Sequence, residues 1–357
     1  MLSLKTRLQK LRQGLAEKEI EAIFISQPEN RRYLSGFDGS SGYLLITPQD
    51  TILATDFRYI GQAKRQAPDY EIFQIIGDVV DWFPKLVAGL NLKNLGFEAG
   101  HITFALHQRL SDILKKAPSQ IRLIPVDGLV ESLRAIKEPE EIELITKAVE
   151  ISDAAVEYIE NVIQIGMSEK EVAWEIEKFT RENGSETIPF ELIVASGPNS
   201  ALPHAKPSSR TIQSGEPVIL DIGARFGGYS SDLSRTICLG TSDDDFRKVY
   251  NTVLDAQLTA MATITEGMSG GQIDNLAREV IEQAGYGEAF GHSLGHGIGL
   301  ASHELPRLAP NSADKLTSGM VFTIEPGIYL AGWGGVRIED VVVMENGKGR
   351  AISKAKK

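Results

Sequence analysis

The sequence predicts a chain of two domains: a smaller α/β domain, followed by an α+β domain that contains an internal repeat. Chains of 357 residues commonly form two domains, each large enough to bury a core. Strand-like and helix-like segments alternate over residues 1–126, whereas long charged helical segments begin at Glu131. We therefore assign residues 1–128 to the first domain and residues 129–357 to the second.

The first domain begins with an amphipathic helix. Leucines recur at positions 4, 8, 11 and 15 with charged residues between them, which is the spacing of one helix face and not the unbroken apolar run of a signal peptide. Six apolar segments follow, with helical patterns between several of them, and this alternation predicts a mixed sheet. The six segments are EAIFIS, GYLLIT, TILATD, YEIFQII, NLGFEA and IRLIPV.

The composition argues against several classes of function. A net charge of −11 disfavours nucleic acid, whose phosphates require a basic surface. No run approaches the eighteen apolar residues that a membrane span needs. The single cysteine, Cys238, can form neither an intramolecular disulfide nor a thiolate metal cluster. We expect a cytoplasmic protein with no nucleic-acid or membrane partner.

The second domain opens with a charged helical stretch, in which Pro139 stands near the start of the main helix. An internal repeat follows, because IQIGMS at 163–168 recurs as ITEGMS at 264–269. Each copy ends one helix and precedes another, which is then followed by a pair of strands. A six-residue match can arise by chance, but the shared order of elements favours a duplicated helix–helix–strand–strand unit.

Four carboxylates occupy matching places in the two halves of this repeat. Asp221 and Asp232 stand on the strand pair of the first half, and Glu325 and Glu339 on that of the second. A pseudo-twofold relation would bring all four together near the centre of one sheet. Any single acid could form a salt bridge with a nearby arginine, but four converging carboxylates repel one another unless cations neutralise them. The pattern therefore favours two divalent metal ions.

The histidines are concentrated beside these acids. Three of the six in the chain, His292, His296 and His303, lie in GHSLGHGIGLASHE at 291–304. Clustered imidazoles are typical of a metal site, a proton relay or an anion site, and one neutral imidazole would complete the carboxylate cluster. His101 and His107 lie on or beside a predicted helix without grouped acids, so we interpret them as surface or packing residues.

Four segments resemble the signature blocks of the pita-bread dinuclear metallopeptidases: LDIGARFGGYSSDLSRT, GHSLGHGIGLASHE, TIEPGIY and GGVRIEDVV. That family includes prolidase, Xaa-Pro aminopeptidase, methionine aminopeptidase and the metal-free creatinase. RRYLSGF and TDFRYIGQA resemble the N-terminal domain of its proline-specific members, and IKEPEEIELITKA resembles their interdomain helix. The resemblance implies a C-terminal pita-bread domain (creatinase/aminopeptidase-like) preceded by an α/β creatinase-like N-terminal domain.

The resemblance also implies the metal ligands. Asp221 resembles the ligand of one ion, Asp232 and Glu339 the carboxylates that bridge both ions, and His296 and Glu325 the ligands of the other. One imidazole among four carboxylates favours Mn²⁺, with Co²⁺ and Zn²⁺ as alternatives. The expected cofactor is thus two divalent ions per chain, with Mn²⁺ as the favoured metal.

Further residues are implied in catalysis and in substrate binding. Glu325 is expected to carry a proton to the leaving nitrogen, and His303 and His204 to stabilise the oxyanion or bind the next carbonyl. His292 could support a ligand or face the substrate. The residues assigned to substrate binding are His292, Arg307 and Arg337.

The implied activity is hydrolysis of an Xaa-Pro bond by a metal-activated bridging hydroxide, on a small peptide with proline at the second position. Arg307 resembles an arginine that in prolidases faces the carboxylate of the dipeptide, which favours a dipeptidase, with Xaa-Pro aminopeptidase as the alternative. Methionine aminopeptidase lacks a domain like residues 1–126, and a metal-free creatinase-like enzyme or a scaffold would lack the ligands. The proline-specific relatives imply a homodimer.

Overall fold

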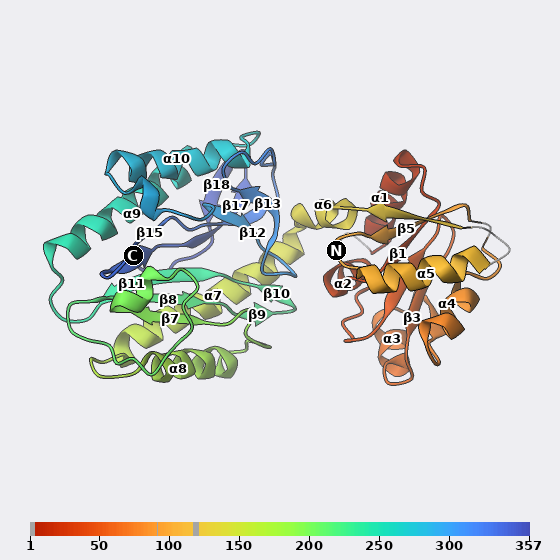
Figure 1. Cartoon of the computed structure of the whole chain (residues 1–357), viewed down its shortest axis with the longest axis horizontal. Helices are drawn as coiled ribbons and strands as arrows, with labels where there is room; N and C mark the ends of the chain where they lie inside the picture. Colours follow the sequence, from red (N-terminus) through yellow and green to blue (C-terminus); the bar gives the residue numbers. More distant parts are fainter. Residues whose placement is uncertain (1–3, 91, 117–120) are drawn as a thin grey trace. The chain divides into compact units, whose positions relative to one another are not determined.

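The computed structural model describes residues 4–90, 92–116 and 121–357, which form two compact units, Met1–Arg134 and Ala135–Lys357 (Figure 1). The division follows Arg134 and not residue 128, because helix α6 (Leu129–Ala135) is bonded to the first unit. Tyr33 Oη donates to the Leu133 carbonyl at 3.3 Å, and Arg134 Nη1 donates to Asn30 Oδ1 at 2.7 Å.

The first unit is built on a mixed six-stranded sheet in the order β4-β3-β2-β1-β5-β6. β1, β5 and β6 run parallel, as do β3 and β4, whereas β2 is antiparallel to both of its neighbours. All six predicted strands are confirmed. They are β1 (Ala22–Ile25), β2 (Tyr43–Ile46), β3 (Thr51–Thr55), β4 (Glu71–Gln74), β5 (Asn94–Glu98) and β6 (Arg122–Val126).

Helices α1 to α5 belong to the same unit as this sheet (Figure 1). The predicted leucine face of α1 is largely buried, through Leu8, Leu11 and Leu15. Trp82 and Phe83 of α4 are buried in the same core as the strands, which explains the strong apolar pattern around them. The short helices α2 and α3 were absent from the sequence prediction. The five are α1 (Leu4–Glu17), α2 (Pro28–Ser35), α3 (Ile60–Gln66), α4 (Val79–Val87) and α5 (Phe104–Lys116).

The second unit consists of two similar halves, each with two helices packed on a sheet (Figure 1). In the first half, α7 and α8 bury apolar side chains against the sheet β11-β8-β7. Its elements are α7 (Pro139–Val162), α8 (Glu169–Glu182), β7 (Ile193–Ser196), the 3₁₀ helix η1 (Gly197–Ala201), β8 (Pro217–Ile222), β9 (Arg225–Phe226), β10 (Tyr229–Ser230) and β11 (Leu233–Cys238).

In the second half, α9 and α10 pack in the same way against strands of the sheet β13-β12-β14-β17-β18. Its helices are α9 (Asp244–Thr263), α10 (Gly270–Gln283) and the 3₁₀ helix η2 (Gly287–Ala289). Its strands are β12 (Gly295–Gly297), β13 (Glu304–Leu308), β14 (Val321–Ile324), β15 (Gly327–Leu330), β16 (Gly334–Arg337), β17 (Asp340–Glu345) and β18 (Lys348–Ala351).

The repeated sequence occupies the same place in each half. In the first copy the Ile212 amide donates to the Met167 carbonyl at 2.9 Å, and in the second the Leu316 amide donates to the Met268 carbonyl at 2.9 Å. Both bonds tie the turn before the second helix to the segment that leads into the next strand. The duplicated unit inferred from six letters is therefore a repeat of the fold.

The carboxylates stand at strand ends more often than the sequence predicted. Asp221 lies within β8, but Asp232 directly precedes β11, Glu325 directly follows β14 and Glu339 directly precedes β17. The reason is that a two-stranded ribbon, β9–β10 or β15–β16, interrupts each predicted strand pair.

The expectation that these acids meet at the centre of one sheet was also wrong. The unit contains two main sheets, and the Glu339 amide donates to the Ser234 carbonyl at 3.1 Å where β11 of one meets β17 of the other. The pseudo-twofold relation thus brings the acids together at a junction between sheets.

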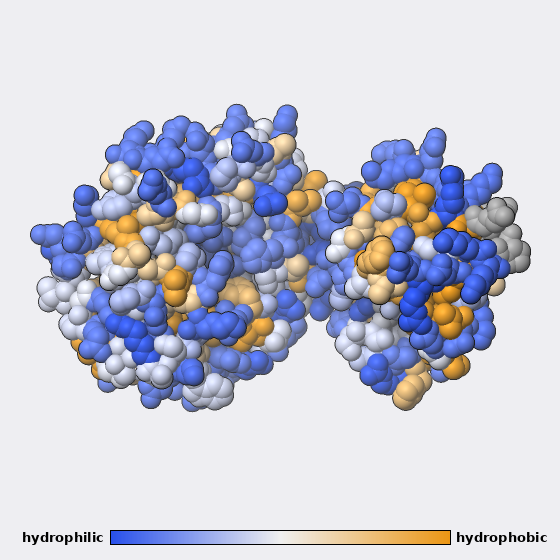
Figure 2. Space-filling view, in the orientation of Figure 1, coloured by the Kyte–Doolittle hydropathy of each residue, from blue (hydrophilic) through white to orange (hydrophobic). Residues whose placement is uncertain are grey.

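Hydrophilic residues cover most of the face drawn in Figure 2, and hydrophobic residues form scattered patches there. Within the described ranges of the chain, no helix combines the length and the apolar character needed to cross a bilayer.

Candidate metal centre

The five residues predicted as metal ligands come together in the second unit. Ligand atoms of Asp232, His296 and Glu339 lie within 4.8 Å of one another. His296 Nε2 lies 3.3 Å from Glu325 Oε1 and 3.6 Å from Asp232 Oδ2. Asp221 is close enough for its charge to raise the pKa of Asp232. Four carboxylates and one imidazole, from five separate segments, therefore form one cluster.

Local structure sets the orientation of His296. Its Nδ1 lies 3.1 Å from the Gly297 carbonyl, a contact that assigns the proton to Nδ1 and leaves the Nε2 lone pair facing the carboxylates. Thr323 Oγ1 accepts from the His296 amide at 3.2 Å and donates to Glu325 Oε1 at 2.9 Å. A single threonine thus positions two neighbouring members of the cluster.

The glycines around His296 let neighbouring strands approach closely. A Cβ at Gly295 would stand 2.0 Å from the Thr323 carbonyl oxygen, and a Cβ at Gly297 would stand 2.0 Å from the Leu305 carbonyl oxygen. Any side chain at either position would push β12 away from its neighbours. The glycine-rich composition of the 291–304 stretch is therefore a packing requirement around the imidazole.

The cluster is electrostatically strained when it holds no cation. Burial raises the pKa of Asp232 and of Glu339 well above the usual carboxyl range, and repulsion from the neighbouring carboxylates adds to the effect. Burial also raises the pKa of Glu325 and lowers the pKa of His296. Each shift disfavours the charged form of its group. The negative charge of the carboxylates must therefore be neutralised by protons or by cations.

Two buried oxygens in the cluster are available to bind a cation. Asp221 Oδ1 and Glu339 Oε1 are buried, and neither has a hydrogen-bond partner among the residues that the structure describes. An unpaired buried carboxylate oxygen is costly, and coordination to a metal ion would satisfy it. The oxygen-rich donor set with one imidazole suits a divalent ion, so the residues present fit the expected metal.

A chain of hydrogen bonds leads away from Asp221. Arg337 Nη2 donates to Asp221 Oδ2 at 2.7 Å, and Nη1 of the same guanidinium donates to Tyr329 Oη at 2.8 Å. Burial raises the pKa of Tyr329, so its hydroxyl stays protonated. The hydroxyl oxygen lies 2.9 Å from His292 Nε2, to which it is hydrogen-bonded. His292 Nδ1 lies 2.8 Å from the Ser293 carbonyl.

Substrate binding by Arg337 and His292 stays a prediction, and the structure shows both side chains bonded to protein atoms. The Arg337 side chain is only 3% exposed and its guanidinium is bonded on all sides, including to Ser234 Oγ at 2.8 Å. Both nitrogens of His292 face protein atoms. The two residues therefore brace Asp221, as does Tyr329, which the sequence prediction missed because a tyrosine within TIEPGIY cannot be distinguished by pattern from an ordinary core residue.

His303, His204 and Arg307 are exposed beside the cluster. The His303 ring stacks on His296 with centroids 3.9 Å apart, and its desolvation together with the charge of His296 lowers the pKa of His303 to about 4. The charge of His204 lowers the pKa of both His292 and His303, so His204 lies near them. Arg307 is the cross-strand partner of His296, so their side chains share one face of the sheet.

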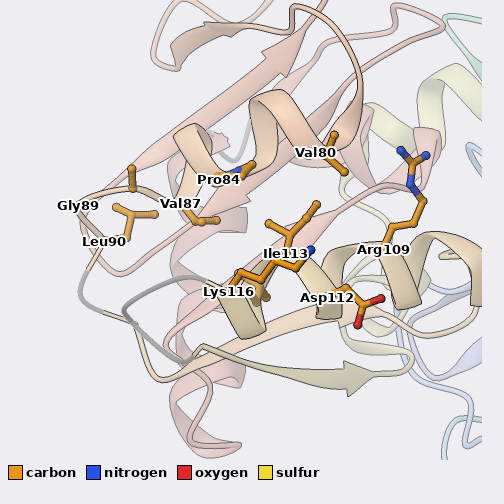
Figure 3. A pocket seen from close by; sticks show the side chains of 11 residues that line it. Val80, Pro84, Val87, Gly89, Leu90, Arg109, Asp112, Ile113 and Lys116 are labelled. Atoms are coloured by element: carbon orange, nitrogen blue, oxygen red, sulfur yellow. The ribbon is translucent and has the colours of Figure 1, made fainter.

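A separate cavity of about 860 Å³ lies in the first unit, between α4 and α5. Val80, Pro84 and Val87 from α4 face Ile113 from α5 across it (Figure 3). Its wall is mainly apolar, and none of the cluster residues belongs to this unit.

The repeated fold and its carboxylate–imidazole cluster define a metal-dependent hydrolase of the pita-bread class. The family model for metallopeptidase family M24 matches residues 143–346, and the model for the creatinase/prolidase N-terminal domain matches residues 7–136. The chain belongs to metallopeptidase family M24 and carries the N-terminal domain of creatinase and prolidase.

Its relatives match it over nearly the whole length. The Xaa-Pro dipeptidase of Pyrococcus furiosus is 37% identical, with 97% of each chain covered. A solved structure of an Xaa-Pro dipeptidase from Bacillus anthracis has a TM-score of 0.95, 42% identity and 99% coverage of each chain. A solved structure of an X-Pro aminopeptidase from Thermotoga maritima has a TM-score of 0.89, 37% identity and 98% coverage of each chain.

Proposed function

We propose that this chain is a metal-dependent Xaa-Pro dipeptidase. The observation that carries the proposal is the cluster of four carboxylates and one imidazole beside exposed His303. It stands in a chain whose full-length relatives include proteins named Xaa-Pro dipeptidase. The substrate is a small peptide with proline at the second position.

Asp221, Asp232, His296, Glu325 and Glu339 would hold two divalent ions, with Asp232 and Glu339 shared between them. Bound divalent ions supply Lewis-acid chemistry, since they make water a nucleophile at neutral pH and polarise a carbonyl. The oxygen-rich donor set favours Mn²⁺ over a metal that prefers nitrogen or sulfur, such as Zn²⁺.

The remaining chemistry falls to three side chains. Glu325, held by Thr323, takes onto a carboxylate oxygen the proton that the attacking water loses, and delivers it to the leaving proline nitrogen as the Xaa-Pro bond breaks. The His303 imidazole is neutral at neutral pH, so it offers one N–H to an oxygen of the substrate as charge develops there. His204 donates in the same way from the neighbouring loop.

Arg307 accounts for the preference for dipeptides. It shares the sheet face of His296, and no side chain within the described ranges pairs with its guanidinium. A dipeptide presents a carboxylate immediately after its proline ring, whereas a tripeptide presents a neutral amide. A charge-assisted bond from Arg307 would reward only the dipeptide.

The second candidate is an Xaa-Pro aminopeptidase that acts on longer peptides. The X-Pro aminopeptidase structure from Thermotoga maritima favours it, because that protein matches the fold nearly as well as the dipeptidase structures do. Substrate length separates the two.

The test compares an Xaa-Pro dipeptide with the matching Xaa-Pro-Yaa tripeptide, with Mn²⁺ added, for the unmodified protein and for Arg307→Ala. We expect kcat/KM for the dipeptide to fall by about 10- to 150-fold in Arg307→Ala, as the loss of ~1.5–3 kcal/mol implies, with a much smaller change for the tripeptide. Arg350→Ala removes an exposed arginine paired with Glu345 and serves as the matched control. Equal losses on both substrates would assign Arg307 a structural role, and faster cleavage of the tripeptide would favour the aminopeptidase.

We also propose a homodimer in the cytoplasm. The dimer rests on resemblance to proline-specific members of the family, and the single cysteine suits a reducing compartment. Light scattering at micromolar concentration should give the mass of two chains, and the mass of one chain would contradict the proposal.

A further inference from the structure

The loop that carries His204 is tied to the protein by a buried acid outside the metal cluster. We infer that Glu169, at the start of α8, is a positioning residue that holds residues 197–208 so that His204 faces the site. This inference rests on the proposed function, in which His204 donates to the substrate.

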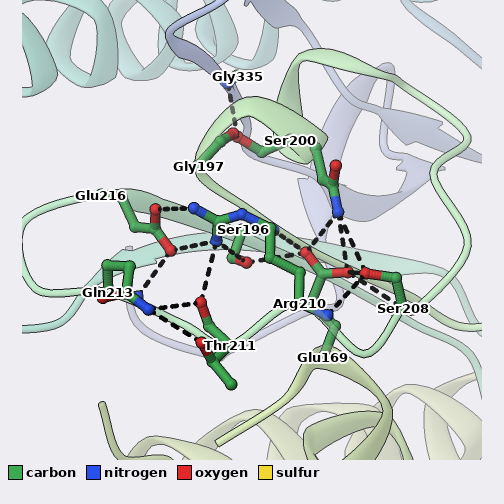
Figure 4. Close-up of polar contacts among 11 residues, drawn as sticks. Glu169, Ser196, Gly197, Ser200, Ser208, Arg210, Thr211, Gln213, Glu216 and Gly335 are labelled. Carbon is green, nitrogen blue, oxygen red and sulfur yellow. Dashed lines mark hydrogen bonds and ion pairs between the residues drawn. The ribbon is translucent and has the colours of Figure 1, made fainter. Parts of the chain in front are cut away.

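The Glu169 carboxylate is fully buried and accepts hydrogen bonds from both ends of the loop (Figure 4). Oε1 accepts from the Ser196 amide and from Ser196 Oγ, each at 2.8 Å. Oε2 accepts from the Ser208 amide at 3.0 Å and from Ser208 Oγ at 2.6 Å. Asn199 Nδ2 lies 3.1 Å from both oxygens. One carboxylate therefore closes the base of the loop.

An arginine–glutamate ion pair supports the same end of the loop. Arg210 Nη1 donates to Ser196 Oγ at 2.6 Å, and the Arg210 guanidinium pairs with Glu216 at 2.5 Å (Figure 4). Burial alone would raise the pKa of Glu169, but the hydrogen bonds from Ser208 and Ser196 outweigh burial and lower it. The carboxylate is thus ionised at neutral pH and every group that faces it is a donor.

The tip of the loop contacts Arg337, the residue that is bonded to Asp221. Ser200 Oγ accepts from the Gly335 amide at 2.8 Å, and the Pro203 carbonyl accepts from Arg337 Nη1 at 3.2 Å. Arg337 in turn holds Asp221. Ala205 packs in an apolar cluster that includes Tyr329. His204 stands between Pro203 and Ala205, so the position of its imidazole depends on a loop fixed at its base by Glu169 and at its tip by the braces of Asp221.

Glu169→Gln is the appropriate probe, because it keeps the volume and removes one acceptor. The new amide group must face donors at Ser196 or Ser208, which releases one side of the loop. Glu171→Gln is the matched control: Glu171 lies on the same helix and is bonded to Ser168, not to the loop. None of the five proposed ligands is bonded to Glu169, so metal content should not change.

The main readout is a double-mutant cycle with His204→Ala. We expect Glu169→Gln to lower kcat/KM on an Xaa-Pro dipeptide by about 10- to 100-fold, as a misplaced catalytic group does. We expect no further loss when it is added to His204→Ala. Additive losses, or lost metal in Glu169→Gln alone, would overturn the inference.

A second readout does not depend on activity. Hydrogen exchange of the amides in 197–208 should accelerate in Glu169→Gln and stay unchanged in Glu171→Gln. If the unmodified protein fails to cleave Xaa-Pro peptides, the proposed function fails while this exchange still decides the role of Glu169. Should Glu169→Gln not fold, Ser208→Ala removes one donor and should show the same changes on a smaller scale; unchanged exchange in that variant would also contradict the inference.

Discussion

At the scale of single residues, the main property of the site is its concentration of buried carboxylates. Asp232 and Glu339 are almost completely buried, and burial together with repulsion from neighbouring carboxylates raises the pKa of each. The sequence could predict this cluster because the repeat places four acids in equivalent segments. The sequence could not predict the bracing of Asp221 by Arg337 and Tyr329, since those contacts depend on side-chain directions at the junction of two sheets.

Asp232→Asn and Glu339→Gln should each abolish metal binding and activity together. Each carboxylate is proposed to bind both ions, so its loss leaves neither ion with a complete set of ligands. We expect the loss of activity to exceed about 100-fold, the upper end for residues that only support a ligand. Elemental analysis of the purified variants, alongside the dipeptide assay, checks this. His303→Ala is the control, because it should lose turnover and keep its metal; metal-free His303→Ala protein would refute the proposed division of roles among the three histidines.

At the scale of elements, the sequence was most informative where local chemistry is strongest. The leucine face of α1 is an example, because its spacing predicted a helix and Leu8, Leu11 and Leu15 are buried in the structure. The structure adds a capping box at two helix starts, Ser168 with Glu171 in α8 and Ser269 with Gln272 in α10. Strands β9 and β10 have only two residues each, too short for a period of two to be recognised. The absence of this ribbon from the prediction explains why Asp232 was placed within a strand.

Ser168→Ala and Ser269→Ala should destabilise the protein by similar amounts. Each removes a side-chain acceptor from the amide of the third helical residue, at 3.3 Å in α8 and 3.2 Å in α10. We expect a cost of ~1 kcal/mol in the free energy of unfolding for each variant. Denaturant unfolding measures it. A loss in only one variant would show that the two caps are not energetically equivalent, although the two halves share one fold.

The Glu169 network predicts a dependence of stability on pH. The pKa of Glu169 is lower in the folded protein than its ordinary value, so its contribution to stability is complete above that ordinary value, about 4.3, and is lost as the pH falls through the folded pKa. Arg210, paired with Glu216, is the charged side chain beside it and stays protonated throughout. The difference in unfolding free energy between the unmodified protein and Glu169→Gln should therefore be constant above about pH 5 and shrink below pH 4. A difference that stays constant down to pH 3 would contradict the assignment.

At the scale of the whole molecule, the order of elements predicted two units and the repeat within the second. Alternating strands and helices indicated the first unit, and duplicated helices with paired strands indicated the second. The structure divides the chain after Arg134, whereas the prediction placed the boundary at residue 128, and contacts such as Arg134 to Asn30 join α6 to the first unit. The junction of the two main sheets, where the cluster forms, arises from long-range pairing that no local pattern encodes.

Restoring metal to chelated protein tests the central claim most directly. The protein should be stripped with a chelator, titrated with Mn²⁺, and followed by the rate of Xaa-Pro dipeptide hydrolysis and by the bound metal per chain. We predict that the stripped protein is inactive and that full activity returns as two ions bind per chain. Undiminished hydrolysis by protein shown to contain no metal would contradict the assignment of the cluster, and saturation with Mn²⁺ without any hydrolysis would contradict the assignment of the activity.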